Sequence, residues 1–163
     1  MFIPALTRKE ELFKKFSEIV YSEDYFYYTG YGHCHYLPEI KQEDNLYQWV
    51  SINDRNKICG YFAYSINPTV DRVYNFGMIS FNKQDLTFAK DVIKHIKKLV
   101  IDHNSIEFRM IAGNPVKKHY DKFVKNYGGN VFELHDVVID NQGNLRNEFI
   151  YEIHNGLRFE GIK

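Results

Sequence analysis

The sequence lacks any long run of apolar residues. No apolar stretch approaches the roughly 20 residues that a helix needs to cross a bilayer. The first residues, Met-Phe-Ile-Pro followed by charged side chains, also lack the basic region and apolar run of a signal peptide. These absences argue against a membrane-bound or exported protein, and we expect a soluble protein in the cytoplasm.

Cysteine is scarce, and neither sign of charge is in excess. The two cysteines, Cys34 and Cys59, do not form a C-x-x-C pair, so free, reduced thiols are expected. The 21 Lys and Arg residues balance the 21 Asp and Glu residues. Because a net charge of zero gives no general attraction to nucleic acids or anionic membranes, we expect neither as a partner.

A metal site is also not predicted. Residues 33–35 read His-Cys-His, and both imidazole and thiolate bind zinc. In an extended chain, however, His33 and His35 share one side while Cys34 points to the other. The sequence indicates no third or fourth ligand, so the segment is expected to form part of a loop wall.

What the chain does have is enough apolar residues for one compact domain. Its 163 residues, 44% of them hydrophobic, suit a single domain over residues 1–163. Aromatic residues are abundant, with 13 Tyr and 13 Phe. Six tyrosines gather in one segment, where they either line a binding groove or complete the core; they are Tyr21, Tyr25, Tyr27, Tyr28, Tyr31 and Tyr36.

Hydrophobic periodicity predicts a mixed order of elements. Thr7 and Glu10 have the spacing of a capping box, which predicts the start of the first helix. The segment 21–36 shows no long apolar stripe and is expected to be mostly loop, with room for a short helical turn. The predicted elements are a helix at 8–20, strands at 46–52, 57–66 and 72–81, a helix from Phe88 to Val100, a strand at 105–112, a helix at 115–127 and strands at 130–140 and 148–154.

This order predicts the fold class. Three strands joined by short turns form an antiparallel meander, and the strand–helix–strand crossover after them adds parallel pairing. A mixed α/β sheet flanked by helices is therefore expected. The lysines at 90, 94, 97 and 98 lie opposite an apolar stripe, which is typical of a solvated helix face rather than a nucleic-acid surface.

One segment gives a more specific signal. Residues 111–129 (IAGNPVKKHYDKFVKNYGG) lead from a strand through Asn-Pro into a helix that carries Tyr and Asp and ends at Gly. With the order of elements over nearly the whole chain, this segment resembles the GNAT N-acetyltransferase superfamily. The resemblance implies acetyl transfer from acetyl-coenzyme A to an amine of a small molecule or peptide, by direct attack. It also implies that Tyr120 protonates the leaving thiolate and that Asn114 contacts the cofactor.

The resemblance also places the cofactor beside the third strand and the following helix. Six residues are predicted to contact it through the strand end and the helix start, namely Ile79, Ser80, Phe81, Thr87, Phe88 and Ala89. In the family a glycine-rich loop binds the pyrophosphate there, but residues 81–89 (FNKQDLTFA) contain no glycine. Asp85 adds a negative charge, whereas Lys83 and Lys90 offer positive charge. A GNAT-fold binding or interaction protein without catalysis is therefore the alternative prediction.

Two further features have open interpretations. Glu107 and Arg109 share one face of a predicted strand; Glu107 could act as a general base, although an exposed ion pair is favoured. His119 adjoins Tyr120 but faces about 100° away on the helix, so it is expected at the surface. The last strand could pair with a second copy in a homodimer.

Overall fold

The chain folds around one seven-stranded mixed sheet. The computed structural model describes all residues except 31, 33–34 and 156–163. The strands are β1 (Phe2–Pro4), β2 (Leu46–Ile52), β3 (Ile58–Asn67), β4 (Arg72–Ser80), β5 (Ser105–Ile111), β6 (Asn130–Ile139) and β7 (Leu145–His154), in the spatial order β1-β2-β3-β4-β5-β7-β6. The helices are η1 (Ala5–Arg8), α1 (Lys9–Ile19), α2 (Glu23–Thr29), α3 (Thr87–Asp102) and α4 (Lys117–Asn126). The predicted mixed sheet flanked by helices is confirmed.

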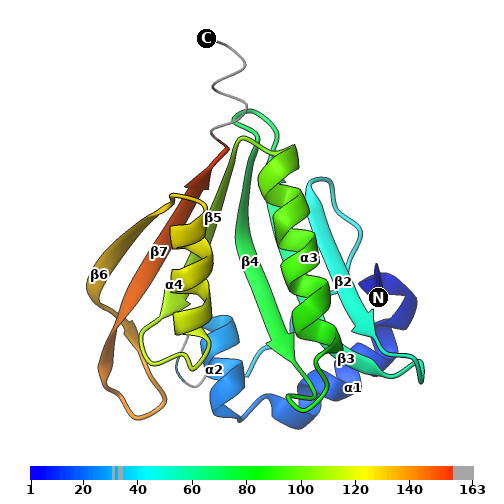
Figure 1. The fold of residues 1–163 in the computed structure, drawn as a ribbon. Coiled ribbons are helices and arrows are strands. Elements are labelled where there is room, and N and C mark those ends of the chain that lie inside the picture. Colours follow the sequence, from blue (N-terminus) through cyan, green and yellow to red (C-terminus); the bar gives the residue numbers. More distant parts are fainter. Residues whose placement is uncertain (31, 33–34, 156–163) are drawn as a thin grey trace.

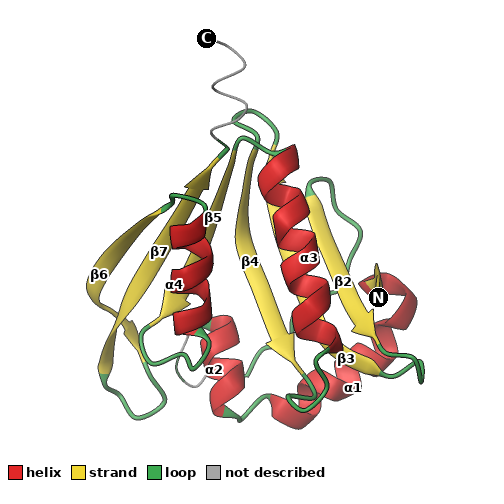
Figure 2. Ribbon diagram, viewed as in Figure 1, coloured by secondary structure: helices red, strands yellow, loops and turns green. Residues whose placement is uncertain are grey.

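Helices cover both faces of this sheet. Figure 1 shows α3 and α4 lying across one face, with α1 and α2 behind it, and Figure 2 separates these layers by colour. On the α3 and α4 side, the core includes Phe62, Val73, Phe88, Ile96, Phe108 and Tyr151. On the α1 and α2 side, it includes Leu12, Phe16, Tyr25, Val50, Tyr61 and Ile79.

The apolar stripe of α3 faces the first core, as its periodicity predicts. Val92, Ile96 and Val100 are buried, and the four lysines on the opposite side are exposed. The amphipathic pattern thus decides which side of the helix meets the sheet. Within the described ranges, no helix is both long and apolar enough to cross a membrane.

The antiparallel half of the sheet contains an irregularity in β4. β3 pairs with both β2 and β4, which confirms the meander. Ala63 lies opposite Gly77, but Ser65 lies opposite Tyr74, so β4 has an extra residue in this stretch. Asn75 there has a φ of 57°. Such a bulge bends its strand and increases the local twist.

β4 and β5 form the parallel pair of the sheet, and their pairing is short. Arg72 lies opposite Ser105 and Val73 opposite Ile106, where the ladder ends. Beyond this point β4 continues alongside β3, and β5 continues alongside β7. The two central strands therefore diverge towards their carboxyl ends, as Figure 1 also shows.

Three local expectations were wrong or incomplete. The Thr7 hydroxyl donates to the Pro4 carbonyl instead of capping α1, because Thr7 lies inside η1, and α1 has no side-chain cap. The aromatic segment contains a seven-residue helix, α2, whose start is capped by Ser22. The short strand β1, absent from the prediction, pairs with β2 at the sheet edge.

The packing of α3 on the sheet depends on Gly60 of β3. A Cβ atom at Gly60 would lie 2.4 Å from the Phe88 ring, which is closer than two carbon atoms can approach without a shift. We expect Gly60→Ala to lower the free energy of unfolding by about 1–3 kcal/mol through overpacking, as measured by urea denaturation.

A matched double variant tests the assignment to this one contact. Adding Phe88→Leu to Gly60→Ala should make the glycine substitution less damaging than it is beside Phe88, since the ring is gone. A Gly60→Ala protein as stable as the wild type would contradict this description of the α3 contact.

Candidate functional site

The candidate site is the gap between the diverging ends of β4 and β5. In the β3–β4 ladder, the Phe81 N–H donates to the Cys59 carbonyl, and hydrogen-bonded pairs alternate along an antiparallel ladder. Consequently the N–H and C=O groups of Met78 and Ser80 point away from β3, towards the gap. Backbone groups exposed in this way can bind an extended polar chain. Met78 was not predicted from the sequence.

Side chains from three elements fill the gap on the α3 and α4 side. The rings of Phe76 on β4 and Phe108 on β5 lie 4.7 Å apart between centroids. Tyr120 on α4 packs edge-on against Phe108, at 5.9 Å. The hydroxyl of Tyr120 then reaches β4 and donates to the Met78 Sδ. Tyr120 therefore bridges the two diverging strands.

The Tyr120 hydroxyl is a buried donor on a weak acceptor. Burial raises the pKa of this phenol well above its ordinary value, because the charged tyrosinate is poorly solvated there. The hydroxyl consequently stays protonated near neutral pH. A thioether sulfur is only a weak acceptor, so a stronger acceptor at the same place would form a better hydrogen bond.

An ionic cluster beneath α4 fixes the position of Tyr120. The neighbouring Asp121 accepts a 2.5 Å hydrogen bond from the hydroxyl of Tyr151 on β7. Lys117 Nζ lies 2.9 Å from the other carboxylate oxygen and 4.1 Å above the Phe149 ring. These contacts attach one side of α4 to β7. They therefore direct Tyr120, the residue before Asp121, over β5.

Several backbone donors in and around the loop between β4 and α3 are used within this region. The Gln84 N–H donates to the Asn82 side chain, and the Asp85 N–H donates to the Asn82 carbonyl. The Thr87 N–H, in the first turn of α3, donates to Asp85 Oδ1 at 2.9 Å. With Phe81 bound to Cys59, these donors are not directed at the surface.

Asp85 is held from three directions. Besides the Thr87 amide, its Oδ2 accepts from Asn53 Nδ2 at 3.0 Å and from the Cys59 Sγ at 3.3 Å. Hydrogen bonds from Thr87, then Asn53 and Cys59, hold the pKa of Asp85 well below its usual range. The carboxylate is therefore ionised, and its charge complements the positive end of the α3 dipole.

The two lysines near this loop differ in their surroundings. Lys83 Nζ lies 2.9 Å from Asp24 on α2, so its charge is already paired. Lys90 is exposed on the first turns of α3. Lys83 is therefore engaged by a carboxylate on α2, and Lys90 carries its charge into the solvent.

The remaining residues predicted to contact the cofactor divide between the two faces of the sheet. Ile79 is buried in the core beneath α1, and the Phe81 ring packs on Phe16 at 5.3 Å. Phe88 is buried against Gly60 on the opposite face, while Ala89 is exposed. Of the six, Ser80 presents backbone groups to the gap; contact with a cofactor stays a prediction for all of them.

At the end of β5, the predicted Asn114 shapes the loop that leads to α4. Its Oδ1 accepts a hydrogen bond from the Val116 N–H at 3.1 Å. Helix α4 begins at Lys117, two residues after Pro115. Asn114 thus lies near the open end of β5, and its contact with a cofactor stays a prediction.

Sequence reasoning did not find a buried ion pair beside this loop. Arg146 Nε lies 3.0 Å from Asp140, whose side chain is 5% exposed. The same guanidinium donates to the Tyr27 hydroxyl and to the Ala112 carbonyl. A Cβ at Gly113 would lie 2.7 Å from it. Arg146 therefore joins the β6–β7 hairpin, α2 and the end of β5, around one end of the gap.

The tyrosines before β2 divide between the core and the surface, and a role in lining a groove stays a prediction. Tyr25 is buried, and the Tyr28 ring packs over Gly77 of β4 and against Phe16. Tyr21 and Tyr36 are exposed, and Tyr31 lies outside the described residues. The rings close to the sheet thus complete the core, and other members of the group line the surface.

Glu107 and Arg109 form the predicted ion pair, at 3.2 Å. Arg109 also contacts Glu148, and Arg72 lies between Glu107 and Glu152. This network lies on the sheet face opposite α4, because Phe108, between the pair, faces the α4 core. His119 is exposed, as expected.

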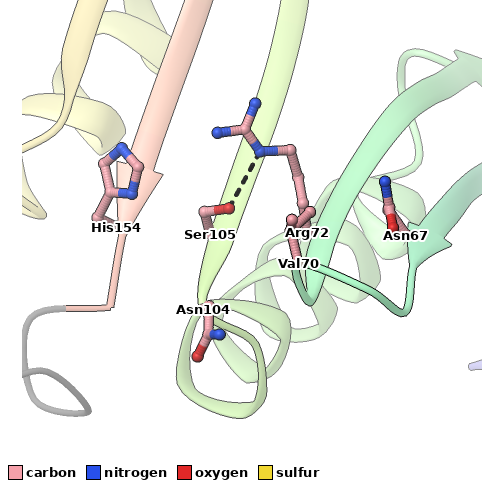
Figure 3. Close-up of a pocket in the computed structure, with 6 residues that line it drawn as sticks. All are labelled: Asn67, Val70, Arg72, Asn104, Ser105 and His154. Atoms are coloured by element: carbon pink, nitrogen blue, oxygen red, sulfur yellow. Dashed lines mark hydrogen bonds between the residues drawn. The ribbon is translucent and has the colours of Figure 1, made fainter.

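A polar pocket lies at the other end of β4 and β5, where the strands still pair. Figure 3 shows it between the β3–β4 turn, β5 and the end of β7, with Arg72 and Ser105 joined by a 3.1 Å hydrogen bond. Arg72 is already engaged there. The pocket is separated from Tyr120 by the length of the strands, so it is not part of the candidate site.

The His-Cys-His segment at residues 33–35 is described only at His35. His33 and Cys34 lie outside the described residues, and His35 packs on Tyr21 with ring centroids 4.3 Å apart. In the part of the chain that the structure describes, no group of three or more His, Cys, Asp or Glu side chains is placed to hold a metal.

Comparison with known proteins bears on this geometry. The sequence matches no protein-family model, and it has no significant match among curated proteins. Solved structures do match. The smu.2055 protein of Streptococcus mutans UA159 is 18% identical, with 95% of this chain and 99% of that chain covered and a TM-score of 0.66.

Acetyltransferases are among the other matches. Mutant forms of the spermidine/spermine N-acetyltransferase SpeG from Vibrio cholerae are 16% identical, covering 75% of this chain and 74% of that one, with a TM-score of 0.57. A probable acetyltransferase is 12% identical over 70% of this chain and 63% of that one, with a TM-score of 0.54. The chain has the GNAT fold. At these identities the similarity shows the fold alone.

The two halves of a GNAT cofactor site fit this chain unequally. The gap exposes the Met78 and Ser80 backbone groups and holds the Tyr120 hydroxyl, which can pair with uncharged polar groups. The start of α3 does not fit a diphosphate, because Asp85 already accepts the Thr87 amide and repels a second anion at short range.

The ionised Asp85 should be visible in acid unfolding. Since its pKa is lower in the folded state than in the unfolded chain, the unfolded state binds more protons in acid. The stability that this group contributes is therefore present above pH 4 and lost as the pH falls below about 4. For Asp85→Asn, we expect the free energy of unfolding to depend on pH more weakly there, by up to one proton.

The measurement is urea unfolding at a series of pH values between 2 and 7. Asp44→Asn, at an exposed position in the loop before β2, is the matched control and should keep the wild-type slope. An Asp85→Asn protein with the wild-type slope would contradict the three hydrogen bonds to this carboxylate.

Proposed function

We propose that this protein is an N-acetyltransferase, which moves an acetyl group from a thioester to an amine. Acetyl-coenzyme A is the donor that the family resemblance implies. The observation that carries the proposal is the Tyr120 hydroxyl, which lies in the gap between β4 and β5 and already donates to a sulfur atom. A donor's sulfur at the same place would receive this hydrogen bond.

The chemistry follows from the position of that hydroxyl. The amine nitrogen attacks the thioester carbonyl carbon, the carbon–sulfur bond breaks, and the electron pair remains on the sulfur. Tyr120 donates its proton to this sulfur, and the proton that leaves the nitrogen restores the phenol in the net balance. No covalent enzyme intermediate is needed, because the amine attacks the thioester directly.

For the thioester to reach Tyr120, the Met78 side chain must move aside. Met78 is partly buried, and a methionine side chain adapts easily because it is unbranched and flexible. The Met78 and Ser80 backbone groups would then bind the polar arm of the donor. In this way the gap would hold an extended thioester chain with its sulfur beside Tyr120.

The acceptor is proposed to be an amine of a small molecule or peptide. The solved SpeG structures are of a spermidine/spermine N-acetyltransferase, so spermidine is a sensible first acceptor. Tyr27, Arg146 and the β6–β7 hairpin lie around one end of the gap and are suited to contact the acceptor.

The last strand, β7, is paired with β5 on one side and with β6 on the other, so the expectation that it pairs with a second copy is wrong. β6 is an edge strand, and its outer backbone groups could pair with those of another chain. We propose that a homodimer forms through this edge; the acetyl transfer chemistry itself requires one chain.

A specific observation supports the second candidate function, a GNAT-fold binding protein without catalysis. The ionised Asp85 stands where the family's pyrophosphate would bind, which disfavours coenzyme A there. Thiol release from acetyl-coenzyme A or acetyl-pantetheine, with a panel of amines that includes spermidine and a short peptide, discriminates between the two. No transfer with any donor and amine would favour the binding protein.

Replacing Tyr120 tests the role of the hydroxyl. We expect Tyr120→Phe to lower the acetyl transfer rate about 100-fold, near the low end for general acid catalysis, because a phenol with a raised pKa is a weak acid. The measurement is kcat from thiol release at saturating donor.

Tyr127→Phe is the matched control. Tyr127 follows α4 and is 38% exposed, so this variant should keep the wild-type rate. If Tyr120→Phe transferred acetyl groups as fast as wild type, Tyr120 would not be the acid.

A further inference from the structure

We propose that this protein recognises its acyl donor through the pantetheine arm alone, so that the adenosine diphosphate half of acetyl-coenzyme A adds nothing to binding. The inference rests on the proposed function and specifies its donor: an acylated pantetheine, whatever is attached to the other end. The main observation behind it is that the carboxylate of Asp85 already occupies the start of α3.

The first argument concerns donors. A diphosphate at a helix start is bound by backbone N–H groups that point outwards. Here the Thr87 amide is taken by Asp85, and the Gln84 and Asp85 amides are taken by Asn82. These donors would have to break existing hydrogen bonds before they could bind a phosphate.

The second argument concerns charge. An α-helix start carries roughly half a positive charge, and the full negative charge of Asp85 lies 2.9 Å from the Thr87 nitrogen. The local field is therefore no longer attractive to an anion. Lys83, the nearest cation in the loop sequence, is paired with Asp24, and Lys90 is exposed on α3, where water and salt screen its charge.

The third argument is that Asp85 cannot simply swing away. Asn53 belongs to the β2–β3 turn and Cys59 to β3, and both donate to the same carboxylate oxygen. Asn53 Oδ1 in turn accepts from the Arg55 and Lys57 amides. Releasing Asp85 would break its hydrogen bonds to the Thr87 amide and the Asn53 side chain, and would leave the Cys59 thiol only its longer contact with the Lys57 carbonyl.

The pantetheine end of the site has no such obstruction from charge. The Met78 and Ser80 backbone groups face the gap, and Tyr120 lies across it. Amide groups of the kind found in pantetheine pair with backbone N–H and C=O groups without any net charge. Recognition is therefore concentrated at the thioester end of the donor.

Calorimetric titration of the full-length protein with coenzyme A, 4′-phosphopantetheine and pantetheine tests the proposal. We expect the three dissociation constants to agree within about threefold, and 3′,5′-adenosine diphosphate not to compete. Coenzyme A binding tenfold or more tightly than pantetheine would overturn the inference but leave the proposed function standing. Binding of none of the three would contradict the proposed function itself, and the inference with it.

A charge-neutral variant reports on the cause. Asp85→Asn keeps an oxygen acceptor but removes the negative charge, so we expect it to bind coenzyme A at least fivefold more tightly while its affinity for pantetheine stays the same. Asp44→Asn makes the same chemical change far from the site and should alter neither affinity. Equal affinities of the Asp85→Asn and wild-type proteins for coenzyme A would contradict the role of Asp85; thermal unfolding confirms that each variant is folded.

Discussion

The divergence of β4 and β5 is the constraint on which the rest of the site depends. The two strands pair only at Arg72–Ser105 and Val73–Ile106, and the extra residue near Asn75 bends β4 away from its regular course. The backbone beyond this point is left facing a gap in the middle of the sheet. A sheet normally satisfies such groups by strand pairing, so the gap is a place where an extended ligand can supply the missing partners.

The helices around this gap have opposite consequences for a bound donor. α4 brings a protonated hydroxyl into the gap, held there by the contacts of its neighbour Asp121 with Lys117 and Tyr151. α3 lies at the end of β4, where its dipole could attract phosphate, but Asp85 cancels that attraction. Under the proposed function, the gap therefore suits a thioester, whereas the start of α3 is unfavourable for a diphosphate. Fold similarity alone would not have separated these two halves.

Much of this architecture could be predicted from local sequence patterns. The apolar stripe of α3 predicted this helix correctly, because one side of it is buried and the other is exposed. Alternation predicted β2 correctly as well, although adjacent residues of this strand, Val50 and Ser51, are both buried. α2 was largely missed since its aromatic side chains show no single apolar stripe, although Ser22 and Gly30 carry capping signals at its ends. Asp85 was recognised as an unfavourable charge, but its partners Asn53 and Cys59 are distant in sequence, so no local pattern could reveal how firmly it is held.

The most direct test of this account is the state of the Asp85 carboxylate in solution. NMR can follow the side-chain carboxyl carbon of Asp85 and the Thr87 amide during a pH titration, with and without inorganic pyrophosphate. The account predicts that Asp85 remains ionised well below the usual range for aspartate, and that pyrophosphate leaves the Thr87 amide signal unmoved. An Asp85 that titrates at its ordinary pKa, or a Thr87 amide that shifts on saturable binding of pyrophosphate, would contradict it.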